Sequence, residues 1–178
     1  MKFCIIVYGN ICSGKTSFCK FLEQYLSQYG FKHFNLDYYR TIYGGKLHVR
    51  EENAKRKFLH DIKNANYCIY ESVGMGRVHD NILSHIAYKE IPHIKVLLNV
   101  PILTCMQRLK NRANIVPMPN YGFSQQESIA KLSSLYLTLK TDLRVDGTDK
   151  EQIKKAITAI GRLSKKALQY QTAHSSYS

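Results

Sequence analysis

Gly9-Asn10-Ile11-Cys12-Ser13-Gly14-Lys15-Thr16 fits the pattern G-x-x-x-x-G-K-[S/T] of a phosphate-binding loop. The apolar run 3–8 precedes this segment and has the composition of a buried strand. Apolar residues at helical spacing follow it: Phe18, Phe21, Leu22, Tyr25, Leu26 and Tyr29. Because such a loop needs a strand before it and a helix after it, the sequence favours a phosphate-binding loop over a chance match in a surface turn.

The residue types of this loop suit a triphosphate. Glycine at each end lets the chain turn tightly, so that backbone N–H groups converge on phosphate oxygens at the N-terminus of a helix. Lys15 would reach the β- and γ-phosphates, and the Thr16 hydroxyl would ligate Mg²⁺. We therefore expect ATP and Mg²⁺ as cofactors. The nucleotide would contact nine consecutive residues: Gly9, Asn10, Ile11, Cys12, Ser13, Gly14, Lys15, Thr16 and Ser17.

Strand-like and helix-like patterns alternate along the chain, which predicts a parallel sheet with helices on both faces. Five strands are predicted, at residues 3–8, 32–36, 67–70, 95–99 and 142–145. Helices are predicted over the apolar stripe above and at residues 51–63, 80–88 and 101–112. Two further helices open with capping-box spacing, at Ser124 with Glu127 and at Thr148 with Glu151. We expect a single domain over 1–171 and a flexible polar tail over 172–178.

In a doubly wound sheet, ligands bind beyond the carboxyl ends of the strands. Asp37 follows the second predicted strand, where a carboxylate can accept the proton of an acceptor hydroxyl, and Arg40 follows it as a candidate substrate contact. Glu71 follows the third strand and could hold Mg²⁺ through water or contact substrate. Arg77 lies just beyond it and is either an acceptor contact or a solvated side chain. The alternatives for Asp37 and Glu71 are a turn-capping aspartate and an exposed strand-end glutamate.

Arg108 and Arg112 lie four residues apart on a predicted helix and so project from one face. Guanidinium groups suit phosphate contacts, so both arginines are candidates to neutralise charge during phosphoryl transfer, although a solvated basic helix face would look the same. The stretch 114–123 carries two prolines and a glycine and is a candidate lid loop.

The composition adds a strong charge signal. The chain carries 26 Lys and Arg against 13 Asp and Glu, a net charge of +13, which favours nucleotides, nucleic acids or phosphorylated metabolites as partners or indicates only a solvated basic surface. Five cysteines without a C-x-x-C pair read as reduced thiols, and seven histidines lack metal-ligand spacing, so no metal cage is predicted. No apolar run is long enough to cross a bilayer and no leader is recognisable, so we expect a cytoplasmic protein without membrane contact.

The motifs resemble those of the P-loop kinases that include nucleoside and nucleotide kinases, uridine-kinase-like enzymes and polynucleotide kinase domains. Residues 9–16 look like their Walker A loop, Asp37 in Leu-Asp-Tyr-Tyr-Arg like their acceptor-activating aspartate, and Glu71 like their third-strand acid. Arg108 and Arg112 resemble their lid arginines. The resemblance implies the three-layer α/β sandwich of P-loop NTPases, with a five-stranded parallel sheet in the order 2-3-1-4-5.

The resemblance also implies Mg-ATP-dependent phosphorylation of a hydroxyl or phosphate on a nucleoside, nucleotide or nucleic acid. The short, nearly uncharged stretch after Arg112 departs from the arginine-rich lid of adenylate kinases, and the third strand lacks the Asp-Arg pair of thymidylate kinases. Two other classes stay open: a nucleotide-dependent switch or NTPase, although the N-K-x-D motif of guanine-nucleotide switches is absent, and a nucleic-acid-binding protein without kinase activity.

Overall fold

The computed structural model describes residues 1–44, 47–112 and 124–175. Five parallel strands form one sheet in the order β2-β3-β1-β4-β5, as expected. The strands are β1 (Phe3–Gly9), β2 (Lys32–Phe34), β3 (Tyr67–Ser72), β4 (His93–Asn99) and β5 (Leu143–Asp146). Each overlaps a predicted strand. The central strand β1 is buried along its whole length, because β3 and β4 pair with its two edges and helices cover both faces of the sheet.

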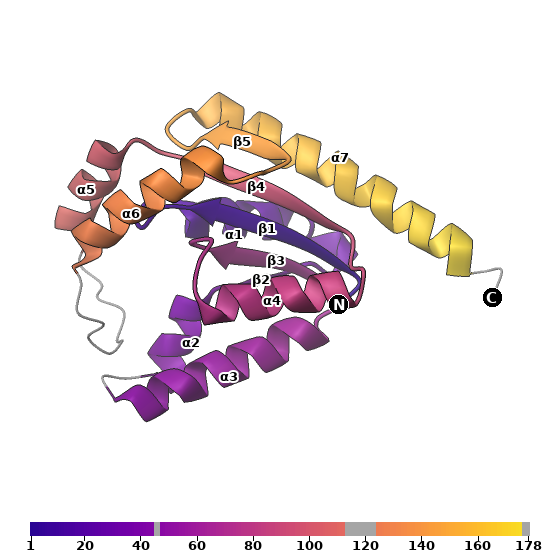
Figure 1. Cartoon of the computed structure of the whole chain (residues 1–178). Helices are drawn as coiled ribbons and strands as arrows, with labels where there is room; N and C mark the ends of the chain where they lie inside the picture. The colour runs from indigo at the N-terminus through magenta and orange to yellow at the C-terminus, as the bar shows by residue number, and fades with distance from the viewer. Residues whose placement is uncertain (45–46, 113–123, 176–178) are drawn as a thin grey trace.

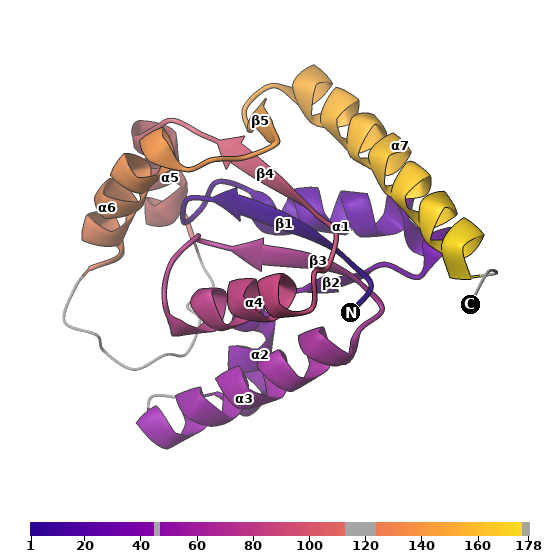
Figure 2. The same cartoon turned by 45° about the vertical axis from the view of Figure 1, so that its right-hand side comes forward.

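Helices cover both faces of this sheet (Figures 1 and 2). In chain order they are α1 (Lys15–Tyr25), the short 3₁₀ helix η1 (Ser27–Tyr29), α2 (Leu36–Tyr43), α3 (His48–Asn64), α4 (Arg77–Tyr88), α5 (Ile102–Lys110), α6 (Gln125–Thr138) and α7 (Lys150–Ser175). Alternate residues of β1 point to opposite faces. Ile5 packs with α1 and α7 on one side, whereas Ile6 packs with α3, α4 and α6 on the other.

Several predicted boundaries differ from the structure by a few residues, and hydrogen bonds explain two of these differences. Leu36 was expected to end the second strand, but it begins α2, because the Asn35 side chain accepts a hydrogen bond from Asp37 N and caps the helix. Thr148 was expected to cap the last helix, but Asp149 does so by accepting hydrogen bonds from two backbone amides of its first turn. The Thr148 hydroxyl instead donates to Asp146 Oδ1 at 2.6 Å. The capping box at the start of α6 is confirmed.

The last helix continues farther than the sequence suggested. Helix α7 runs to Ser175 and so includes the first four residues of the expected tail, whereas 176–178 lie outside the described residues. The candidate lid loop 114–123 also falls outside the part of the chain that the structure describes. Among the described helices, none combines the length and apolar character needed to cross a membrane. The strands point toward the end of the molecule where α5 and α6 lie together (Figures 1 and 2).

Candidate active site

The phosphate-binding loop joins β1 to α1, and its backbone explains its glycines. Gly14 caps α1 with φ 91°, in the left-handed region that glycine adopts without strain. A Cβ atom at Gly9 would lie 2.7 Å from Ser13 Oγ and 3.0 Å from the carbonyl oxygen of Leu98, so a side chain there would force the loop open. Cys12 also has a positive φ of 59°, which is uncommon outside glycine and marks a tightly constrained turn.

Asn10 anchors the loop to the rest of the molecule. Its Nδ2 donates to the carbonyl oxygen of Ile129 at 2.9 Å and to Ser133 Oγ at 2.8 Å, both on α6. Its Oδ1 accepts from Ile11 N at 2.8 Å. The side chain of Asn10 is therefore fully used in positioning the loop, and its backbone carbonyl is the group left to face Lys15.

Lys15 lies in the first turn of α1 and is only 7% exposed. Its Nζ donates to the carbonyl oxygen of Asn10 at 2.7 Å. Burial lowers the pKa of Lys15, and the negative charge of Glu71 acts in the opposite direction. An ammonium that is desolvated in this way and hydrogen-bonded to a single neutral acceptor is poised to gain from an incoming anion.

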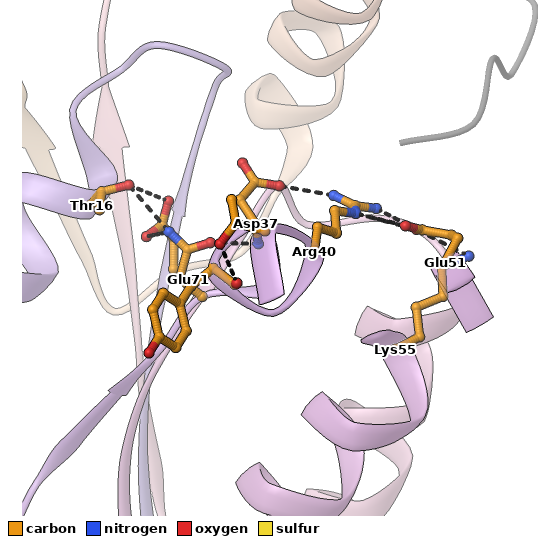
Figure 3. Close-up of polar contacts among 9 residues, drawn as sticks. Thr16, Asp37, Arg40, Glu51, Lys55 and Glu71 are labelled. Atoms are coloured by element: carbon orange, nitrogen blue, oxygen red, sulfur yellow. Dashed lines mark hydrogen bonds and ion pairs between the residues drawn. The ribbon is translucent and has the colours of Figure 1, made fainter. Parts of the chain in front are cut away.

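Thr16 and Glu71 face each other across the end of the sheet (Figure 3). Thr16 Oγ1 donates to Glu71 Oε1 at 2.9 Å, and Asn35 Nδ2 donates to Glu71 Oε2 at 2.9 Å. His33 Nε2 lies 3.1 Å from the same Oε2. Burial acts to raise the pKa of Glu71, but the hydrogen bond from His33 and the charge of Lys15 outweigh it, so this pKa lies below its ordinary value. A hydroxyl beside an ionised carboxylate is a hard-oxygen donor set that fits Mg²⁺.

Asp37 belongs to a chain of charged groups that runs from α2 to α3 (Figure 3). Arg40 Nη1 donates to Asp37 Oδ1 at 2.9 Å, while Arg40 Nη2 donates to Glu51 Oε1 at 2.7 Å and Nε donates to Glu51 Oε2 at 3.1 Å. Glu51 is 1% exposed and also lies 3.4 Å from Lys55 Nζ. Two buried carboxylate oxygens thus fix the guanidinium that holds Asp37, and the side chain of Asp37 keeps 43% exposure toward solvent.

A cavity of about 580 Å³ brings most of the predicted residues together. Its lining includes twelve of the candidates: Ile11, Cys12, Gly14, Lys15, Thr16, Ser17, Asp37, Arg40, Glu71, Arg77, Arg108 and Arg112. Gly9, Asn10 and Ser13 lie outside this lining, since they form the base of the loop. Arg108 Nη1 donates to the Cys12 carbonyl oxygen at 3.3 Å, so this side chain lies against the loop. Arg77, Arg108 and Arg112 are all exposed residues at the margin of the cavity.

A second cavity of about 390 Å³ adjoins the other side of the loop. Phe18 and Phe21 from α1, Arg108 from α5 and Gly147 after β5 contribute to its walls. A Cβ atom at Gly147 would lie 2.5 Å from Val100 Cγ2, so only glycine fits at this point of the chain. The sequence analysis missed Phe21 as a site residue, because its place in an apolar stripe predicts a core position, yet it is 59% exposed.

The sequence analysis also missed the polar partners of the predicted acids. Asn35 and His33 contact Glu71, and Glu51 and Lys55 extend the network of Asp37. One signal for Glu51 was present, because it shares a helix face with Ala54, Phe58 and Ile62, three buried apolar residues. A carboxylate on a buried face predicts a cationic partner.

Comparisons with solved structures bear on the fold. A putative kinase from Chloroflexus aurantiacus superposes with a TM-score of 0.63 at 18% identity, over 92% of this chain and 97% of that one. Shikimate kinase from Bacteroides thetaiotaomicron gives 0.57 at 13% identity, over 92% and 98%. Deoxyadenosine kinase from M. mycoides, solved with bound dATP, gives 0.55 at 17% identity, over 88% and 98%. No protein-family model matches the chain, and neither does any curated protein sequence. The chain therefore has the α/β P-loop fold that these kinases share.

Proposed function

We propose that the protein is an ATP- and Mg²⁺-dependent kinase that transfers the γ-phosphate to a hydroxyl or phosphate of a nucleoside, nucleotide or nucleic-acid acceptor. One observation carries this proposal: Asp37 lines the same cavity as Lys15, Thr16 and Glu71. A triphosphate held by the loop would present its terminal phosphorus to the Asp37 carboxylate, which Arg40 holds in place at 2.9 Å.

The two cavities would bind different parts of the donor nucleotide. The second cavity, beside Phe21 and Arg108, suits the base of the donor nucleotide, because an aromatic side chain and a guanidinium both stack on flat rings. The loop amides and Lys15 would bind the phosphates, and Thr16 with Glu71 would hold Mg²⁺, which would neutralise the negative charge that develops during phosphoryl transfer. Arg108 lies between the two cavities and would contact the phosphates.

Asp37 is assigned as the general base. Its carboxylate would accept the proton of the acceptor hydroxyl as the oxygen attacks the γ-phosphorus, and Arg40 keeps the carboxylate oriented toward the cavity. Arg77 and Arg112, at the margin, are proposed to contact the acceptor and the transferring phosphate respectively. The net charge of +13 supports an anionic acceptor, including a polynucleotide end.

Transfer of label from γ-labelled ATP tests the proposal directly. A panel of nucleosides, nucleotides and short DNA and RNA strands is offered with Mg²⁺, and at least one acceptor should become labelled. Asp37→Asn should lower the rate by roughly 10²–10⁴-fold, the usual contribution of a positioned base. Asp80→Asn, an exposed carboxylate on α4 outside the cavity lining, is the matched control and should retain the rate.

Two outcomes would contradict the assignment. ATP hydrolysis without transfer to any acceptor would favour a switch or an NTPase over a kinase. Equal rates for Asp37→Asn and Asp80→Asn would remove Asp37 from the mechanism and leave the phosphate-binding loop as the only functional assignment.

A further inference from the structure

Three side chains that could ligate a metal meet under the phosphate-binding loop. Cys19 lies on α1, His33 on β2 and Glu71 on β3, and their ligand atoms all lie within 4.8 Å of one another. Cys19 is fully buried, and the side chains of His33 and Glu71 are 8% and 11% exposed. No spacing pattern could reveal this cluster, because three separate elements of the fold bring its members together.

The ligand types select a borderline-soft cation. Thiolate, imidazole and carboxylate together are the ligands that zinc takes in proteins, whereas Mg²⁺ prefers oxygen alone. Tetrahedral zinc, with bonds of about 2.0–2.3 Å, needs ligand atoms roughly 3.3–3.7 Å apart. His33 Nε2 and Glu71 Oε2 are 3.1 Å apart, and no pair of the three ligand atoms is more than 4.8 Å apart, so these two values lie on either side of the tetrahedral range.

The two oxygens of Glu71 point to different partners. Oε1 accepts from Thr16, whereas Oε2 accepts from Asn35 Nδ2 at 2.9 Å and lies 3.1 Å from His33 Nε2. The carboxylate is thus shared between the hard-oxygen position beside Thr16 and the position formed with His33 and Cys19. A fourth ligand of the second position would be water entering through the cavity that Glu71 lines.

We propose that Cys19, His33 and Glu71 form a binding site for Zn²⁺ or a similar soft divalent cation, and that occupation of this site antagonises Mg-nucleotide binding. Two dications that share one carboxylate repel each other, so each weakens the binding of the other. A rise in free zinc would then lower nucleotide occupancy without altering the fold. The antagonism rests on the proposed function, whereas the metal site itself does not.

Cobalt(II) is the probe, since it occupies zinc sites and reports its ligands by absorption. Titration of the full chain under reducing conditions should produce a sulfur-to-cobalt charge-transfer band and intense visible bands of tetrahedral geometry, and added Zn²⁺ should remove both. Cys19→Ser should abolish the charge-transfer band. His33→Gln, which can still donate a hydrogen bond to Glu71, should weaken cobalt affinity by roughly 100-fold or more, beyond the 10–100-fold that loss of an outer-shell partner costs.

Cys68→Ser is the matched control. Cys68 Sγ lies 3.0 Å from Cys4 Sγ and 3.6 Å from Met1 Sδ, so these sulfurs form the rival soft-metal position among the described residues. The band should survive this substitution. Loss of the band in Cys68→Ser with retention in Cys19→Ser would assign the metal to the rival sulfurs and overturn the proposal, as would the absence of any band in the wild type.

Circular dichroism in metal-free buffer checks that each variant is folded, and His33→Gln keeps the test decisive if Cys19→Ser is not. Mg-ATP should displace cobalt from the wild type. Cobalt binding through Cys19 and His33 without any effect of Mg-ATP would support the metal site and refute the antagonism. Kinase activity without a cobalt band would refute the metal site and leave the proposed function intact.

Discussion

The substitution Glu51→Gln tests the ion network that holds Asp37. It removes the charge of a carboxylate that is 1% exposed and that receives hydrogen bonds from Arg40 at 2.7 and 3.1 Å. Neutralising one partner of a buried pair costs about 3–5 kcal/mol, because the other charge stays buried without compensation. Arg40 retains Asp37 at 2.9 Å, so we expect the lower end of this range. For a domain of this size, a loss of about 3 kcal/mol lowers Tm by roughly 6–12 °C.

Glu52→Gln provides the matched control for this measurement. Glu52 is the next residue of α3, and its side chain is 56% exposed and lies 2.9 Å from Lys55 Nζ. Exposed pairs of this kind contribute about 0–1 kcal/mol. Urea unfolding and thermal melting of the two variants should therefore differ by about 2 kcal/mol or more in the free energy of unfolding. Equal losses in the two variants, or a loss below about 1 kcal/mol in Glu51→Gln, would show that the buried network does not stabilise this face.

Three further substitutions give independent tests. Lys15→Met should raise the melting temperature of the protein without nucleotide, because a buried charge is removed and the carbonyl oxygen of Asn10 still accepts from a backbone amide. The stabilisation by Mg-ATP should disappear in this variant. A variant that Mg-ATP still stabilises would contradict the assignment of the loop. Burial lowers the pKa of His79, so protonation favours the unfolded state, and wild-type stability should fall as the pH drops through about 6.5, the ordinary pKa of histidine, as urea midpoints would show. His79→Asn should flatten that dependence, and an unchanged slope would exclude His79 as its source. Tyr136→Phe removes a hydrogen bond of 2.9 Å to the carbonyl oxygen of Val73 and should cost about 0.5–1.5 kcal/mol in urea unfolding, with no loss counting against the bond.

The general architecture could be predicted because local and global signals agree. The loop 9–16 is flanked by a strand and a helix whose apolar patterns match their burial, and all five strands were located to within two residues. The strand order followed from the resemblance to P-loop kinases rather than from periodicity, which carries no information on which strands pair. Asp37 and Glu71 were singled out by their positions after predicted strands; in the structure Glu71 lies within β3 and Asp37 in the first turn of α2, and both line one cavity.

The contacts of Glu71 with His33 and of Arg40 with Glu51 could not be predicted, because each joins residues on separate elements of the fold. His33 reaches Glu71 only because β2 pairs with β3, and Arg40 reaches Glu51 only because α2 packs on α3. The sequence also left open which residue caps α7, since Thr148 and Asp149 both have side chains that can accept hydrogen bonds from a helix N-terminus. Asp149 caps the helix because the Thr148 hydroxyl donates to Asp146 Oδ1 at the end of β5, a contact that the sequence pattern does not reveal.

The hydrogen bond between Lys15 and its own loop has a consequence for how a nucleotide is recognised. Folding has already stripped the ammonium of most of its hydration shell, so an arriving phosphate does not have to do so again. When the ligand binds, Lys15 only exchanges the carbonyl oxygen of Asn10 for a phosphate oxygen, and the phosphate oxygen is negatively charged. Discrimination between a triphosphate and a neutral competitor is therefore built into the loop itself, since a neutral oxygen offers Lys15 nothing that the backbone does not already supply.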